Sequence, residues 1–178
     1  MRVIAGEFRS RRLLSLPGLD TRPTPDRLRE TLFNILAPII EGAVFVDAYA
    51  GTGAVGIEAI SRGARLAVFI EKDREAVEVI KVNLASLDIK SRGRIIRGAA
   101  ALHLASIDSD IVFLDPPYPK DTEYQIALDV ISAKPPTLTI VQHSARYSIP
   151  DKYESLTRTR TVRQGDNALS FFIAEEAE

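Results

Sequence analysis

A single stretch, residues 44–56, restricts most strongly what this chain can fold into. It reads V-F-V-D-A-Y-A-G-T-G-A-V-G, an apolar run that ends in an acid and passes through glycines into a helical pattern. Gly51, Gly53 and Gly56 have the spacing G-x-G-x-x-G. Glycines at this spacing permit a tight turn, close approach of backbone N–H groups to a ligand, and close packing of the helix. The stretch therefore predicts a nucleotide-binding turn at the end of a parallel strand.

The context of this turn supports the prediction. The apolar strand Leu66–Ile70 follows, and Glu71 closes it about 20 residues beyond Gly51, where a doubly wound domain places its ribose-binding acid. Glycine-rich turns without a ligand are common, so the motif gains its weight from the strand before it, the helix after it and this acid.

The rest of the chain alternates between strand and helix patterns, which predicts a doubly wound α/β fold with a mostly parallel sheet. A Thr- and Arg-rich segment and a last apolar run, joined by a short turn, predict an antiparallel hairpin at the end. We expect seven strands in the order 3-2-1-4-5-7-6. The predicted strands span 44–48, 66–70, 94–97, 111–114, 138–141, 153–162 and 169–173, and helices start near 24, 54, 73 and 122.

Length and composition exclude several classes of protein. The 178 residues suit one Rossmann-like domain, and the absence of cysteine excludes thiol catalysis, Cys-ligated zinc and disulfides. His103 and His143 have no ligand partners at metal-binding spacing, so we expect no metal. The first residues lack a signal-peptide pattern, and no apolar run approaches the about 20 residues of a membrane helix. We therefore expect a cytoplasmic protein with no membrane partner.

Charge is distributed unevenly along the chain. The net charge is −1, yet the first 30 residues hold seven arginines against four acids. Guanidinium groups suit bidentate phosphate contacts and stacking on bases. Residues 1–20 are therefore predicted to form a basic arm containing a small β-hairpin, although a solvated charged face explains the charges equally well. The candidate nucleic-acid contacts are Arg9, Arg11, Arg12 and Arg22.

A second motif, Asp115-Pro116-Pro117-Tyr118, follows the predicted strand 111–114. Strands one and four are neighbours in the predicted order, at the switch point where ligands bind, so this turn should face the glycine turn across one crevice. The prolines stiffen the turn and leave carbonyl acceptors, and Asp115 adds another acceptor. Tyr118 offers a face on which a base can stack. The combination suits the exocyclic amine of a base, whereas elsewhere in a chain it would indicate only a rigid turn.

The two motifs resemble those of Rossmann-type S-adenosylmethionine-dependent methyltransferases that modify exocyclic amines. Three segments are similar to the bacterial RsmD-like family, which methylates the N2 amine of a guanine in 16S ribosomal RNA: T-R-P-T-P-D-R-L-R-E-T-L-F-N, A-Y-A-G-T-G-A-V-G-I-E-A-I-S-R-G-A and D-P-P-Y. The likeness spans nearly the whole chain, including the basic arm and the final G-D-x-x-L-S-F hairpin.

The resemblance implies a role for each matching residue. Asp115, Pro116, Pro117 and Tyr118 would position the guanine amine, and the arm would bind RNA, with residues 21–178 forming the methyltransferase domain. The partner would be 16S ribosomal RNA or a small-subunit particle, and the chain a monomer. One departure is Ala99 in G-A-A, where many of these enzymes have an acid near the adenine. The residues implied to bind S-adenosylmethionine are Thr24, Asp47, Gly51, Thr52, Gly53, Glu71, Lys72 and Asp73.

Three alternatives stay open on the sequence. A nicotinamide-dependent dehydrogenase would explain the glycine turn and Glu71 but gives no reason for D-P-P-Y. A methyltransferase acting on adenine N6 in DNA or another RNA would share the site, but DNA enzymes usually add a target-recognition segment. An inert RNA-binding module would need neither motif intact.

Overall fold

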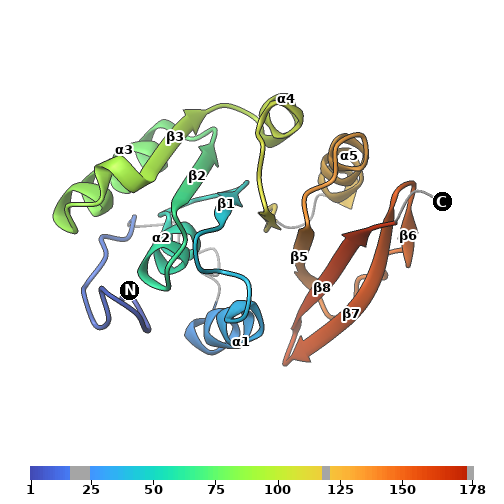
Figure 1. Ribbon diagram of the computed structural model, residues 1–178, viewed down its shortest axis with the longest axis horizontal. Coiled ribbons are helices and arrows are strands. Elements are labelled where there is room, and N and C mark those ends of the chain that lie inside the picture. Colours follow the sequence, from blue (N-terminus) through green and yellow to red (C-terminus); the bar gives the residue numbers. More distant parts are fainter. Residues whose placement is uncertain (17–24, 118–120, 176–178) are drawn as a thin grey trace.

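The computed structural model describes residues 1–16, 25–117 and 121–175. Within them one eight-stranded sheet has the order β3-β2-β1-β4-β5-β8-β7-β6 (Figure 1). The first five strands are parallel to their neighbours, and β8 pairs antiparallel with both β5 and β7. The strands are β1 (Val44–Asp47), β2 (Leu66–Glu71), β3 (Gly93–Arg97), β4 (Ile111–Leu114), β5 (Leu138–Ser144), β6 (Lys152–Tyr153), β7 (Leu156–Gln164) and β8 (Asn167–Ala174).

The predicted α/β class and strand order are confirmed, but the predicted number of seven strands is one too low. The segment predicted as one strand over 153–162 is divided at Glu154, whose φ of 44° breaks the extended backbone. The two residues before the break form β6, which pairs only with the start of β7. A strand of two residues is too short to leave a periodic pattern in the sequence.

Helices cover both faces of the sheet. Figure 1 shows α4 and α5 on one side of the sheet and α1 on the other. Alternate strand residues serve the two faces: Val44 and Val46 pack in the cluster that includes α5, whereas Phe45 packs with α1. The helices are α1 (Asp26–Leu36), α2 (Ala54–Ser61), α3 (Arg74–Ser86), α4 (Ala100–His103) and α5 (Asp121–Ser132), with 3-10 turns over Lys90–Arg92 and Leu104–Ser106.

The start of α1 differs from the expected arrangement in one position. A proline often occupies the first helical position, but Pro25 is the N-cap of α1, with an extended ψ of 138°. Its carbonyl accepts hydrogen bonds from Leu28 and Arg29, which close the first turn. Asp26 is therefore the first helical residue and places its carboxylate at the positive end of the helix dipole.

The N-terminal segment lies against α2 and α3 instead of extending into solvent (Figure 1). The expected β-hairpin is reduced to a single antiparallel bridge between Arg2 and Arg12. Val3 and Leu13 are buried in the same cluster as Ile57 on α2. Among the described helices, none has the length and apolar character required to span a bilayer.

Candidate active site

The two sequence motifs begin side by side at the carboxyl edge of the sheet. β1 and β4 are neighbours, with Asp47 opposite Phe113. The next residue, Ala48, donates its backbone N–H to the Phe113 carbonyl at 3.0 Å. The glycine turn leaves β1 and the Asp115 turn leaves β4 from these adjacent positions. The pairing of strand β1 with strand β4, which the predicted strand order implied, is thus present in the structure.

The glycine turn depends on residues without a Cβ for two different reasons. Gly53, the N-cap of α2, has a φ of 80°, a left-handed conformation that other residues adopt at a cost. Gly56 lies against the sheet, where an added Cβ would come within 2.3 Å of the Phe69 ring. The spacing in the sequence therefore reflects both the turn and the close packing of α2.

Acids at the ends of β1 and β2 hold this turn. The Gly56 N–H donates to the Asp47 carboxylate at 3.0 Å, and the Gly51 N–H donates to the Glu71 carboxylate at 2.8 Å. The Gly53 N–H donates to the Ala50 carbonyl at 2.7 Å. Two of the three amides over 51–53 are thus used within the turn. The Thr52 N–H has no acceptor among the described residues, and a Cβ built on Gly51 would meet no atom within 4 Å.

Asp47 is a buried carboxyl group with an unusual pKa. Burial raises the pKa of Asp47 to about 7, the hydrogen bond from Gly56 opposes the rise, and the nearby negative charge of Glu71 adds to it. Two carboxyl groups beside an open glycine turn favour a ligand that carries hydroxyl donors or positive charge. This is the electrostatic character of the predicted cofactor position.

The residues after Glu71 have structural roles of their own. The Asp73 carboxylate caps α3 by accepting the Ala76 N–H at 2.9 Å, and the Asp73 N–H donates to Glu71 at 2.8 Å. Lys72 is exposed next to them. Ala99 is exposed as the N-cap of α4, so no acidic side chain stands at that position.

The acceptor turn after β4 changes from buried to exposed along its length. Asp115 is half-buried, Pro116 is buried and Pro117 is exposed. Tyr118 lies outside the described residues, as do Thr24 and Arg22.

A tyrosine connects the glycine turn to α5. Tyr49, in the turn after β1, donates its hydroxyl to the Glu123 carboxylate on α5 at 3.3 Å. Burial, together with the charge of Glu123, raises the pKa of Tyr49. Since α5 follows the Asp115 turn in the chain, this contact ties the glycine turn to the element beyond the acceptor turn.

Sequence reasoning missed Asn83, which is buried on α3. Its side-chain oxygen accepts the Leu14 N–H at 2.7 Å. Its amide nitrogen donates to the Leu14 carbonyl at 3.2 Å and to the Thr52 carbonyl at 3.0 Å. Asn83 therefore joins the N-terminal segment to the glycine turn. A polar residue within the apolar stripe of a helix is the signal that could have identified it.

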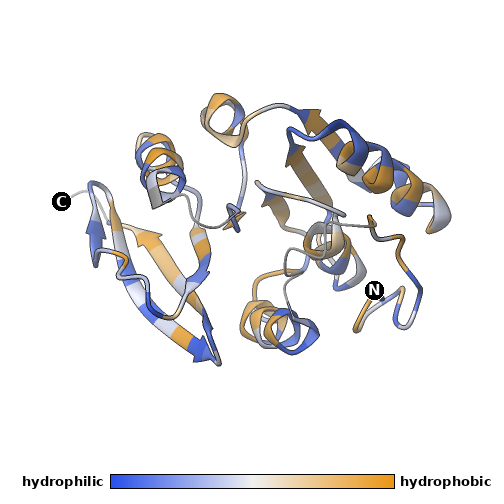
Figure 2. Ribbon diagram, turned by 180° about the vertical axis from the view of Figure 1, so that it is seen from behind, coloured by the Kyte–Doolittle hydropathy of each residue, from blue (hydrophilic) through white to orange (hydrophobic). Residues whose placement is uncertain are grey.

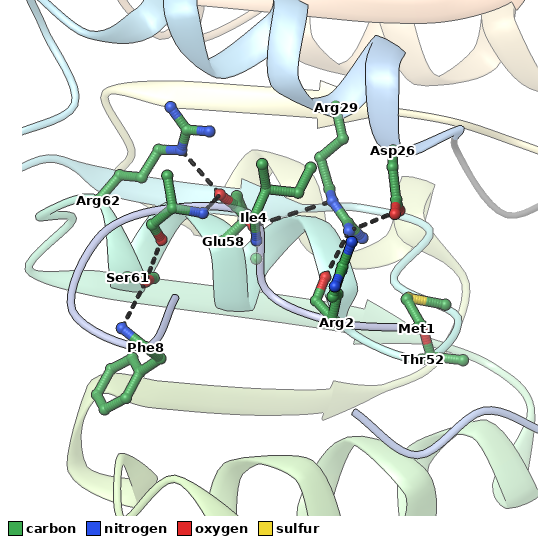
Figure 3. A network of polar contacts seen from close by, with 12 residues as sticks. Met1, Arg2, Ile4, Phe8, Asp26, Arg29, Thr52, Glu58, Ser61 and Arg62 are labelled. Atoms are coloured by element: carbon green, nitrogen blue, oxygen red, sulfur yellow. Dashed lines mark hydrogen bonds and ion pairs between the residues drawn. The ribbon is translucent and has the colours of Figure 1, made fainter. Parts of the chain in front are cut away.

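A second polar residue, Glu58 on α2, anchors the same N-terminal segment (Figure 3). Its fully buried carboxylate accepts the N–H groups of Ile4 and Ala5 at 2.8 and 3.0 Å. Arg62 donates to it at 2.8 Å, and the buried Arg29 lies 3.9 Å away. Figure 3 also shows Met1 beside Thr52 of the glycine turn.

The arginines of the arm have different environments. Arg9 and Arg12 are exposed, and the Arg11 guanidinium donates to the Ser86 carbonyl on α3 at 2.9 Å. Arg11 thus has a structural contact, whereas Arg9 and Arg12 present their side chains to solvent.

A shallow cavity of about 360 Å³ lies elsewhere on the molecule. Val44, Asp110 and Pro136 are among its lining residues, which are at the amino ends of β1, β4 and β5. It is on the opposite edge of the sheet from the two motifs and does not belong to this site.

Comparison with known families agrees with the motifs. Residues 1–173 match the family model described as conserved hypothetical protein 95. The chain belongs to this family. This match, together with the relatives described next, confirms the resemblance to the RsmD-like methyltransferases.

Individual relatives carry methyltransferase names. The chain is 32% identical over 181 residues to YlbH of Bacillus subtilis, provisionally named an rRNA methyltransferase, covering 97% of this chain and 98% of that protein. It is 45% identical over 122 residues to ribosomal RNA small subunit methyltransferase D of Escherichia coli, covering 66% and 60% of the two chains. The match to the E. coli protein thus spans about three fifths of that relative's length. The solved structure of yhhF from Escherichia coli, provisionally named a methyltransferase, has a TM-score of 0.86 at 30% identity and 98% coverage of both chains.

Proposed function

We propose that this chain is an S-adenosylmethionine-dependent rRNA methyltransferase that modifies the N2 amine of a guanine in 16S ribosomal RNA. The observation that carries the proposal is the pairing of β1 with β4, which sets a glycine turn and an acceptor turn side by side at one edge. The relatives named as rRNA methyltransferases support the substrate class. The D-P-P-Y acceptors support an exocyclic amine as the target.

The residues around the glycine turn fit S-adenosylmethionine. Each carboxylate oxygen of Glu71 accepts one backbone N–H, from Gly51 or from Asp73. Each oxygen can therefore accept a further hydrogen bond from a ribose hydroxyl. The open side of Gly51 and the Thr52 N–H suit the methionine end, and Asp47 favours positive charge there. Lys72 and Asp73 would line the adenosine side, and Thr24 would close the site from the start of α1. When bound, the cofactor would supply a methyl group on a sulfonium, from which a neutral thioether departs as a good leaving group.

The acceptor turn holds the nucleophile. The carboxylate of Asp115 and the carbonyl of Pro116 would accept the two N–H groups of the guanine amine and favour pyramidal nitrogen as positive charge develops. Pro117 would keep the turn stiff, and Tyr118 would stack on the base. The base must leave the stack of its RNA helix to enter the site. Alignment of the amine with the methyl group is the main contribution required of the protein.

Exposed arginines of the arm would contribute RNA affinity. Arg9 and Arg12 are available for phosphates, and Arg22 is proposed with them from its place in the sequence. Arg11 would act through the arm's attachment to α3, since its guanidinium contacts Ser86.

Replacement of Asp115 tests the proposal. Asp115→Asn should lower kcat for tritiated methyl transfer to unmodified small-subunit particles by about 100-fold or more, because one charged acceptor of the amine is lost. Affinity for S-adenosylhomocysteine, measured by calorimetry, should change less than about twofold. Asp108→Asn, in an exposed acid at the opposite edge, is the matched control.

Mass-spectrometric mapping of the product completes the test. Methyl on a guanine N2 supports the proposal, whereas methyl on adenine N6, or transfer to DNA in preference to ribosomal RNA, would favour the alternative methyltransferase. Unchanged turnover of Asp115→Asn would remove the assigned role of the acceptor turn.

A further inference from the structure

The C-terminal hairpin carries positive charge that the proposed site does not use. β7 contains Arg158, Arg160 and Arg163 and no acid, β8 contains no charged residue, and the turn between them contains one exposed acid, Asp166. In the described chain β6 covers β7 only at Leu156 and Thr157, which leaves the outer edge of the longer strand open. Figure 2 shows a largely hydrophobic β8 beside a β7 that is hydrophilic toward the turn.

Sheet register places the end of this hairpin at the same edge as the acceptor turn. Asn167, at the start of β8, pairs with both Ser144 at the end of β5 and Gln164 at the end of β7. β4 lies next to β5 and ends at Leu114, directly before the acceptor turn. Three strand spacings separate β4 from β7, which is roughly 14 Å. The hairpin turn therefore borders the substrate side of the proposed site.

Two exposed arginines stand at this border. Arg146 follows the end of β5, and Arg163 is the penultimate residue of β7. A hydrogen bond from the Ala145 N–H to the Asp166 carbonyl, 2.9 Å long, joins the turns that carry them. Among the described residues neither guanidinium has a hydrogen-bond or ion-pair partner, in contrast to Arg158, which pairs with Asp151.

We propose that Arg146 and Arg163 form a second RNA-binding surface, which holds phosphates of the nucleotides that flank the target guanine. The proposal rests on the proposed function, because it takes ribosomal RNA as the ligand. A guanidinium presents a planar pair of donors to a phosphate, and an unneutralised one is available for that contact. The basic arm lies at the other end of the molecule (Figure 1), so the RNA would be held on both sides of the reacting base.

The strand supplies a matched control in Arg160. It pairs with Phe171, whose side chain belongs to the core cluster that contains α1, whereas Arg163 pairs with Ala168 on the opposite face. Arg160 is also farther from the hairpin turn. Arg160→Gln and Arg163→Gln change the net charge by the same amount. The two variants therefore differ only in the position of the charge that is removed.

The experiment measures binding to in-vitro transcribed, unmodified 16S ribosomal RNA over a range of salt concentrations. Arg146→Gln and Arg163→Gln should each weaken binding about fivefold and reduce the slope of log affinity against log salt by about 0.7 to 1. Arg160→Gln should shift affinity less than about twofold, and S-adenosylhomocysteine affinity should stay constant in all variants.

The outcomes separate this inference from the proposed function. Equal weakening by Arg160→Gln and Arg163→Gln would overturn the inference, because the effect would then be general electrostatics. Wild-type affinity and salt slope in Arg146→Gln and Arg163→Gln, with normal methyl transfer by the parent protein, would also overturn it while leaving the proposed function intact. A parent protein that neither binds nor methylates ribosomal RNA would overturn both.

Discussion

The carboxyl groups at the ends of β1 and β2 combine two tasks in single residues. Asp47 and Glu71 hold the backbone of the glycine turn through Gly56 and Gly51, and the same two carboxyl groups flank the position proposed for the cofactor. A substitution at either residue therefore alters the turn itself as well as any contact to a ligand. Asp47 is the more informative of the two, because it is fully buried and its pKa lies near neutrality.

Asp47 should make stability depend on pH in a defined direction. Burial raises its pKa from an ordinary value near 4 to about 7, so between these values the folded chain holds a proton that the unfolded chain releases. The stabilising effect is complete below about pH 4 and is lost as the pH rises through about 7. Asp47→Asn should remove this dependence, so urea unfolding should show the variant gaining relative to the parent between pH 5 and 8.

A ligand measurement checks the same group. Binding of the positively charged cofactor near pH 7 should favour ionised Asp47 and release a proton. Calorimetry of S-adenosylmethionine in buffers of different ionisation enthalpy should detect this proton, and Asp47→Asn should not release it. Stability curves of parent and variant that run parallel over this pH range would contradict the assignment.

At the scale of elements, α3 connects the N-terminal segment to the glycine turn. Asn83 reaches both through three hydrogen bonds, and each partner atom belongs to the backbone. The contact to Thr52 fixes the middle of a turn whose own amides are otherwise held at Gly51 and Gly53. The helix thus supports the glycine turn, where the cofactor is proposed to bind.

Asn83→Asp should test whether Asn83 affects cofactor affinity through the position of the glycine turn. The substitution keeps the shape and the acceptor for the Leu14 N–H, but it places an oxygen against the carbonyls of both Leu14 and Thr52, so the turn should be displaced. The KM for S-adenosylmethionine should rise about tenfold, with kcat and the KM for RNA changing less than about twofold.

Arg92→Met is the control for this prediction, since Arg92 holds the N-terminal segment through Glu7 and does not contact the turn. An equal rise of KM in both variants would mean that attachment of the segment, and not the position of Thr52, determines cofactor affinity.

At the scale of the whole molecule, buried charge attaches the N-terminal segment to the domain. Glu58 accepts the backbone N–H groups of Ile4 and Ala5, which precede it by 54 and 53 positions in the sequence. Its negative charge also offsets the positive charge of the buried Arg29. Burial lowers the pKa of Arg29, and the charge of Glu58 opposes that change. One polar network therefore joins the segment, α1 and α2.

Glu58→Gln should destabilise the chain by roughly 3 kcal/mol, because the buried guanidinium of Arg29 would keep only the largely exposed Asp26 as a carboxylate partner. Urea unfolding of the variant against Glu30→Gln, an exposed acid on α1, measures the difference. Hydrogen exchange of the Ile4 and Ala5 amides should accelerate in Glu58→Gln alone. Equal stability of the two variants would show that the carboxylate does not anchor the segment.

These contacts mark the boundary of what the sequence predicts. Strand β4 followed from its continuous apolar run, and the pairing of β1 with β4 followed from the strand order of doubly wound sheets. The partners of Glu58 and Asn83 did not follow, since a polar residue in an apolar helix face indicates some partner without naming it. β6 was missed because Glu154 interrupts the extended backbone after only two residues.

The open outer edge of β7 has a consequence for handling the protein. An uncovered strand presents unpaired amide and carbonyl groups that can pair with a strand of another molecule, and the charge of the β7 arginines discourages such pairing. Apolar replacements along this strand would invite fibrous or amorphous precipitation in concentrated samples. Variants at Arg160 and Arg163 are best made with glutamine, which removes charge yet leaves the border of the sheet hydrated.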